Sequence, residues 1–185
     1  DGVADLLDDF VSGMREGGLS VTLKTFPGIG NVSADVTESI AENTDSLMTI
    51  RDTNFVPYAS GIQAGADCVM VSNAAYSKLT VKKVPAFMSQ DIVTKLLREE
   101  LGFDGIVMTS PLNDNVIENN YTNEFAVVEA VKAGCDLIVL PGNFKECYEA
   151  LITAVEEGRI DEKVINTSVR RILQNKIQRG ILVLE

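Results

Sequence analysis

Ser110 is the residue whose position says most about chemistry in this chain. It follows an apolar run, 105–109, that has the length and composition of a buried strand. In parallel α/β folds, ligands meet the carboxyl ends of such strands. A serine hydroxyl is a weak nucleophile unless a base removes its proton, and the 185 residues contain no histidine. We therefore expect Ser110 to be a plain strand end, with a catalytic serine as the less favoured alternative.

Three further polar side chains stand near the ends of apolar runs. Lys24 either donates hydrogen bonds to a ligand or pairs with a nearby acid, because buried lysines are rarely left unpaired. Asn73 follows another strand, where a ligand role and a structural role are equally open. Asp114, four residues beyond Ser110, is a candidate displaced carboxylate, although acids in polar loops are usually only solvated.

Composition restricts the classes of partner. Twenty-seven acidic against sixteen basic residues give a net charge of −11, which repels phosphate backbones and predicts no nucleic-acid partner. No apolar run is long enough for a membrane span, and the acidic start differs from the basic start of a signal peptide. The compartment stays open between cytoplasmic and exported. The three cysteines lack metal-ligand spacing, so the sequence predicts neither a metal site nor a cofactor.

The segments that must position these residues alternate between helical and strand-like periodicity. Four times an amphipathic stretch passes through a glycine into a short apolar run, as expected of parallel βα units. The predicted helices are 4–15, 55–64, 89–101 with Ser89 as N-cap, and 124–132; the strands are 19–26, 67–74, 105–109 and 136–140. Two more helices, 144–157 and 161–179, follow. Asp104 and Asp136 stand at strand entrances and are predicted to be turn residues.

This pattern indicates the α/β class with parallel strands, in either a small open sheet or half of an eight-stranded barrel. The segment 24–31 reads Lys-Thr-Phe-Pro-Gly-Ile-Gly-Asn. It closely resembles a signature of glycoside hydrolase family 3, usually Lys-His-Phe-Pro-Gly-His-Gly-Asp in the bacterial β-N-acetylglucosaminidase branch. The segments 64–72, 96–108, 133–137 and 168–173 also resemble that family, in its order and approximate spacing.

The resemblance covers nearly the entire chain and implies a TIM-type (β/α)₈ barrel. This chain would be about its second half, a single partial domain over 1–185. The first strands, which in the family bring an acid and an arginine to the sugar, would lie outside it.

The resemblance also implies which positions held the family's catalytic groups. Ser110 stands where the family has its aspartate nucleophile, and Ile29 and Asn31 stand where it has a histidine acid/base and an assisting aspartate. Retaining hydrolysis needs a nucleophile and a proton donor, so no catalytic position is intact. Thr25 replaces a sugar-contacting histidine, while the family's Lys24 is kept. Lys24, Thr25 and Asn73 therefore remain the candidate substrate-binding residues.

Two functions follow from these substitutions. The favoured one is a catalytically degenerate domain that binds carbohydrate or serves a structural role. The alternative is an active glycosidase for β-linked N-acetylglucosamine or related glycosides, working through acids such as Asp114 and Asp35 or through groups partly outside this chain. Exposed edges of an apolar parallel sheet are prone to association, which predicts a homo-oligomer or association with an N-terminal half-barrel.

Overall fold

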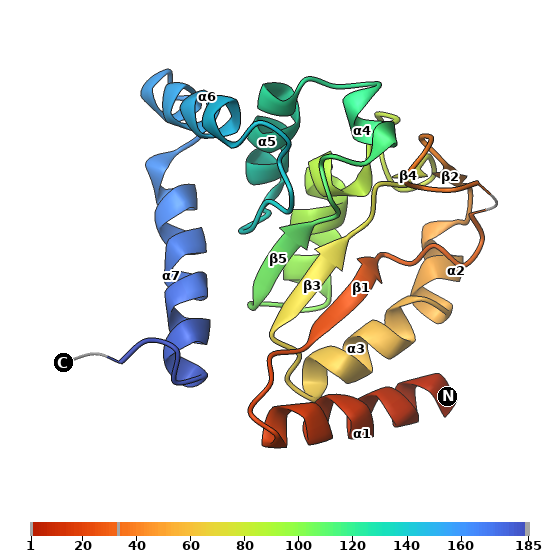
Figure 1. Cartoon of the computed structure of the whole chain (residues 1–185). Helices are drawn as coiled ribbons and strands as arrows, with labels where there is room; N and C mark the ends of the chain where they lie inside the picture. The colour runs from red at the N-terminus through yellow and green to blue at the C-terminus, as the bar shows by residue number, and fades with distance from the viewer. Residues whose placement is uncertain (1, 33, 184–185) are drawn as a thin grey trace.

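The computed structural model describes residues 2–32 and 34–183 (Figure 1). The helices are α1 (Gly2–Glu16), α2 (Leu47–Asp52), α3 (Phe55–Gln63), η1 (Ala86–Met88), η2 (Asp91–Glu100), α4 (Asn115–Glu118), α5 (Asn123–Ala133), α6 (Phe144–Glu156) and α7 (Glu162–Gln178). The strands are β1 (Thr22–Phe26), β2 (Glu42–Asn43), β3 (Cys68–Val71), β4 (Ala75–Tyr76) and β5 (Ile106–Thr109).

A parallel sheet with the order β1-β3-β5 forms the centre of the molecule. Helices connect its strands, and Figure 1 shows α1 and α3 beside β1 and α7 on the side of β5. The short strands β2 and β4 pair with each other beyond the carboxyl ends of the main strands. The predicted α/β class with parallel βα units is confirmed.

The predicted fourth strand, 136–140, was wrong as a strand. It contributes a single bridge, between Leu137 and Met108. The next ladder bond would join the Val139 N–H to the carbonyl of Thr109, but that N–H instead donates to the Thr109 hydroxyl at 3.1 Å. Leu140 then turns to a φ of 43°, which leaves the extended region. Pairing therefore stops after one bridge, although the segment still runs beside β5.

Glycine ends the predicted helices because it adopts positive φ without strain. Gly65 has a φ of 92° and Gly134 a φ of 111°, and each sits at the corner between a helix and the next apolar run. The Cβ of another residue at Gly134 would lie 3.2 Å from Thr94 Oγ1, so the corner is also closely packed. The start of η2 was predicted one residue too early: its N-cap is Gln90, and Ser89 precedes it.

Two aspartates at the entrance to the sheet fix neighbouring segments. Asp67 Oδ2 accepts the Val21 N–H, just before β1, at 2.9 Å. Asp136 Oδ2 accepts the Val107 N–H of β5 at 2.9 Å. Each carboxylate thus bonds the backbone at or just before the neighbouring strand of the sheet. Asp136 lies in a bend at the strand entrance, as predicted, but its carboxylate is also fully buried and accepts a hydrogen bond from Arg98 at 2.5 Å.

The other oxygen of each aspartate faces α7, whose ladder of polar side chains crosses the sheet entrance. Asp67 Oδ1 accepts hydrogen bonds from Asn175 at 3.1 Å and Arg179 at 2.6 Å. Asp136 Oδ1 accepts a hydrogen bond from the hydroxyl of Ser168, nearer to the start of α7, at 2.7 Å. None of the described residues of α7 is buried, so polar contacts contribute much of its attachment.

Candidate functional site

Loops that leave β1, β3 and β5 meet at one edge of the sheet. The Ser72 N–H donates to the Phe26 carbonyl at 2.9 Å, and the Ser110 N–H donates to the Val71 carbonyl at 2.9 Å. These two bonds place the strand ends at the same level. The sequence-predicted positions after β1, β3 and β5 therefore share one face, as the parallel arrangement requires.

Ser110 is engaged in structural hydrogen bonding. Its side chain is buried, and its hydroxyl donates to the Val71 carbonyl at 2.9 Å, alongside the backbone bond from the same residue. A nucleophile must instead give its proton to a base. The geometry agrees with the expected plain strand end.

Asn73 and Asp114 form the most polar pair at these strand ends. Asn73 is 1% exposed, and its Nδ2 donates to Asp114 Oδ2 at 2.8 Å. Asn73 Oδ1 has no hydrogen-bond partner among residues 2–32 and 34–183. Partial burial, together with the nearby carboxylates of Asp35 and Glu38, raises the pKa of Asp114 although the Asn73 bond opposes the shift. The carboxyl is thus biased toward its protonated form.

Asn31 and Ile29 lie on the loop that follows β1. The Asn31 amide donates to both oxygens of Asp45, at 3.0 and 2.8 Å, and Ile29 is exposed. Asp45, which follows β2, was missed by the sequence analysis because no periodic segment marked its neighbourhood. Isoleucine and asparagine side chains have no ionisable group, so neither Ile29 nor Asn31 can act as a general acid or base.

Lys24 and Thr25 line a groove of about 790 Å³ that runs along the free edge of β1. Apolar side chains of α1 and α3, among them Phe10 and Val56, form its other walls. Lys24 is exposed and makes no ion pair with any residue that the structure describes. The Lys24 ammonium is therefore available to a ligand or to an acid on further barrel strands.

A small β2-β4 sheet ties the loops above the strand ends together. Tyr76 is completely buried, and its hydroxyl donates to the Gly28 carbonyl at 2.9 Å. Burial raises the pKa of Tyr76 well above its usual value, which keeps the hydroxyl a donor. The sequence analysis placed residues 72–76 at a strand end. It did not predict the β2-β4 pairing or the Tyr76–Gly28 hydrogen bond, because two-residue strands show no detectable periodicity.

The described residues contain no group of three or more His, Cys, Asp or Glu placed to hold a metal ion. Within the same part of the chain, no helix combines the length and apolarity needed to cross a bilayer.

Residues 2–175 match the model of the glycosyl hydrolase family 3 N-terminal domain. The chain belongs to glycosyl hydrolase family 3. It is 33% identical over 180 residues to a "Beta-hexosaminidase" of Stenotrophomonas maltophilia (strain K279a), which covers 97% of the chain and 50% of that protein. A "Beta-hexosaminidase" of Xylella fastidiosa (strain M23) is 33% identical over 138 residues, 75% of the chain and 41% of that protein.

A solved family 3 structure has the same fold. The glycoside hydrolase family 3 β-N-acetylglucosaminidase from Paenibacillus sp. str. FPU-7 superposes with a TM-score of 0.90 at 32% identity, over 96% of the chain and 35% of that protein. The expected family and partial barrel are thereby confirmed. The chain spans half or less of the length of these family 3 relatives.

Proposed function

We propose that this family 3 domain binds carbohydrate at its strand ends without cleaving the glycosidic bond. The observation that carries the proposal is Ser110, which stands at the end of β5 and donates its hydroxyl to a backbone carbonyl. The absence of histidine from the 185 residues supports it, because the family's pattern places a histidine at the proton-transfer step. Ile29 and Asn31, at the positions matched to that step, offer no proton-exchanging group.

The sugar contacts that we propose are Lys24, Thr25 and Asn73. Lys24 and Thr25 stand near the carboxyl end of β1, and Lys24 makes no ion pair with a described residue. Asn73 has an unpartnered, buried carbonyl oxygen, which matches the donor of a sugar hydroxyl. The names of the relatives make N-acetylglucosamine the first sugar to test.

Binding without turnover is the result we expect from two assays. An aryl β-N-acetylglucosaminide should not be hydrolysed, while calorimetry with N-acetylglucosamine should give a measurable heat. Lys24→Ala should weaken binding, whereas Lys145→Ala, an exposed lysine of α6, is a control that should not. Clear turnover by the unaltered chain would overturn the non-catalytic proposal.

A second candidate, an active glycosidase for β-linked N-acetylglucosamine or related glycosides, is favoured by the two acids Asp114 and Asp35. The pKa of Asp114 is raised, as a general acid requires, and the pKa of Asp35 is lowered by hydrogen bonds from the backbone and hydroxyl of Thr37. Turnover that survives in Ser110→Ala and disappears in Asp114→Asn would support this candidate.

The groove along β1 also suggests a partner. We propose that the free strand edge is covered by further barrel strands, supplied by a second copy of the chain or by an N-terminal half-barrel. The apolar walls of the groove support this, because unpaired edges beside apolar surface favour strand addition. We further propose that residues 1–185 act together as one partial barrel domain.

A further inference from the structure

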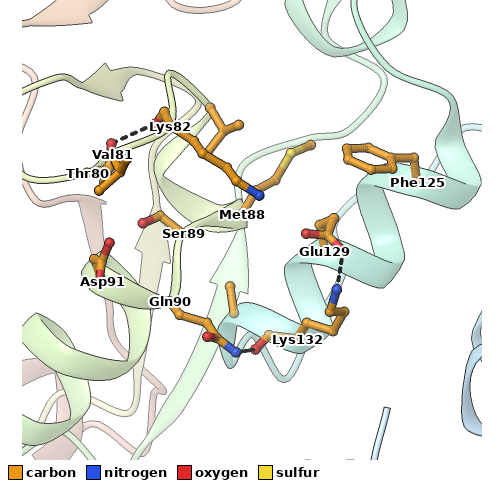
Figure 2. Close-up of a pocket in the computed structure, with 12 residues that line it drawn as sticks. Thr80, Val81, Lys82, Met88, Ser89, Gln90, Asp91, Phe125, Glu129 and Lys132 are labelled. Atoms are coloured by element: carbon orange, nitrogen blue, oxygen red, sulfur yellow. Dashed lines mark hydrogen bonds and ion pairs between the residues drawn. The ribbon is translucent and has the colours of Figure 1, made fainter. Parts of the chain in front are cut away.

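We infer that the chain carries a second saccharide pocket on the outside of the barrel, formed by the 80–84 loop, the start of η2, and α5. The pocket has a volume of about 370 Å³. Figure 2 shows Lys82, Ser89 and Asp91 on one side and Phe125, Glu129 and Lys132 of α5 on the other. None of the strand-end residues proposed to bind sugar lines it, so it is a separate site.

Ser89 is the observation that points to a ligand. The residue is only 6% exposed, yet it lines the pocket and its hydroxyl has no hydrogen-bond partner within 2–32 and 34–183. Its carbonyl, in contrast, accepts the N–H groups of Ile92 and Val93 at 3.1 and 2.9 Å. The Ser89 hydroxyl is not among the fully buried side-chain atoms that lack a partner, so it is open to the pocket and free to bond a ligand. A ligand hydroxyl in this pocket can exchange a hydrogen bond with it.

Two carboxylates give the pocket additional acceptors. Asp91 Oδ1 receives Lys95 at 2.7 Å, and Glu129 Oε1 receives Lys132 at 2.6 Å. The second oxygen of each carboxylate has no partner in the described part of the chain, and Lys82 supplies a donor nearby. Donors and acceptors thus face the same space, which suits hydroxyl groups because each can both donate and accept.

Two walls of the pocket are held at a fixed spacing. Gln90 Nε2 donates to the Lys132 carbonyl at 2.8 Å, which joins the start of η2 to the end of α5 (Figure 2). Phe125 is 49% exposed at the rim, and its ring stacks on Tyr121 with 5.8 Å between centroids. The stacked ring offers an apolar face, against which the C–H face of a sugar ring can pack.

The charges favour a neutral ligand over an ionic one. Lys82 and Lys132 balance Asp91 and Glu129, and both signs occur on the pocket walls. An anion would meet the carboxylates, and a cation would meet the ammonium groups. A saccharide unit combines neutrality, hydroxyl groups and an apolar face, so it fits the pocket better than a phosphate or an amine.

Amide-resolved NMR titration of the whole chain with N-acetylglucosamine and its β-1,4 dimer tests the inference. We expect the amides of Ser89, Gln90 and Phe125 to shift saturably. Ser89→Ala and Phe125→Ala should each weaken this binding by about 3- to 10-fold, the effect of one lost hydrogen bond or contact. Phe144→Ala is the matched control, because Phe144 is 71% exposed and stacks on Tyr148 outside the pocket.

Three results would overturn the inference. One is a titration in which Lys24 and Asn73 shift but the pocket amides do not, which would leave the proposed function standing. Another is equal affinity at the pocket in the unaltered chain and in Ser89→Ala. The last is that inorganic phosphate binds saturably at the pocket while neither N-acetylglucosamine nor its dimer binds there. Shifts at the pocket alone would support it even if the strand-end proposal failed.

Discussion

At the scale of single residues, Ser110 joins two strands through both its backbone and its side chain. Its N–H and hydroxyl both donate to the Val71 carbonyl, so the residue bonds β5 to the end of β3. A carboxylate at the same position would face that carbonyl oxygen instead. With the side-chain direction that Ser110 has in this chain, the Val71 carbonyl would repel that charge.

Ser110→Asp should therefore destabilise the fold by about 1–3 kcal/mol at pH 7, the cost of a buried polar group without a partner. The loss should shrink as the pH falls, because repulsion raises the pKa of the new carboxyl and its protonated form can donate to Val71. Urea denaturation of the variant at pH 7 and at acid pH measures this change in the free energy of unfolding. Ser110→Ala, which loses only one hydrogen bond, is the control, and an equal loss in both variants would contradict the account.

Asp67 makes the stability of the unaltered chain fall at acid pH, which is the opposite of the trend expected for Ser110→Asp. Burial acts to raise its pKa, but the hydrogen bonds from Arg179 and Val21 and the charge of Arg15 outweigh burial and lower it. A lowered folded-state pKa stabilises the fold fully above the ordinary value of about 3.9, and the stabilisation is lost as the pH falls through the folded-state pKa. Asp67→Asn should flatten the acid limb of the stability curve, measured by urea denaturation between neutral and acid pH.

At the scale of elements, the entrance to β5 depends on a close approach between backbones. A Cβ at Gly105 would lie 2.5 Å from the Asp67 carbonyl oxygen and 2.5 Å from the Phe103 ring. The carbonyl also accepts the Ile106 N–H at 2.9 Å, so it cannot move away without breaking the β3-β5 ladder. Only glycine fits there.

Gly105→Ala should cost about 2 kcal/mol or more, because overpacking of a close-packed site is destabilising. Gly13→Ala is the matched control, since Gly13 lies within α1 and its added Cβ would meet nothing within 4 Å. That control should gain about 0.5–1 kcal/mol from helix propensity. Thermal denaturation of the two variants compares their stabilities, and similar stability in both would contradict the packing argument.

Elements with a clear period could be predicted from the sequence, and those held by tertiary contacts could not. Helices α6 and α7 matched their predicted spans to within one residue at each end, because apolar periodicity and glycine stops agree there. The 136–140 run has strand composition, yet a side-chain hydroxyl takes the place of a ladder carbonyl. For the candidate site, the sequence predicted the shared strand ends but not the Asn73–Asp114 or Asn31–Asp45 pairs, which join separate loops.

At the scale of the whole molecule, a net charge of −11 coexists with an apolar groove along β1. The charge opposes association of two copies, and salt screens such repulsion. If a second copy covers the groove, light scattering should give a mass above that of the 20.0 kDa chain, and more so at high salt.

Val56→Asp places a charge in the groove and should lower the associated fraction. Met48→Asp, at an exposed position of α2 outside the groove, should leave it unchanged. A monomer at micromolar concentration in both low and high salt would contradict association between copies.

The attachment of α7 has a consequence for synthesis of the chain. Asp67 is made early, whereas its contacts Asn175 and Arg179 come more than a hundred positions later, at separations of 108 and 112. A chain that stops before residue 175 lacks both of these contacts and keeps only Arg15 as a guanidinium contact of Asp67. Such a truncation would leave the buried Asp67 carboxylate with fewer hydrogen-bond donors at the sheet entrance.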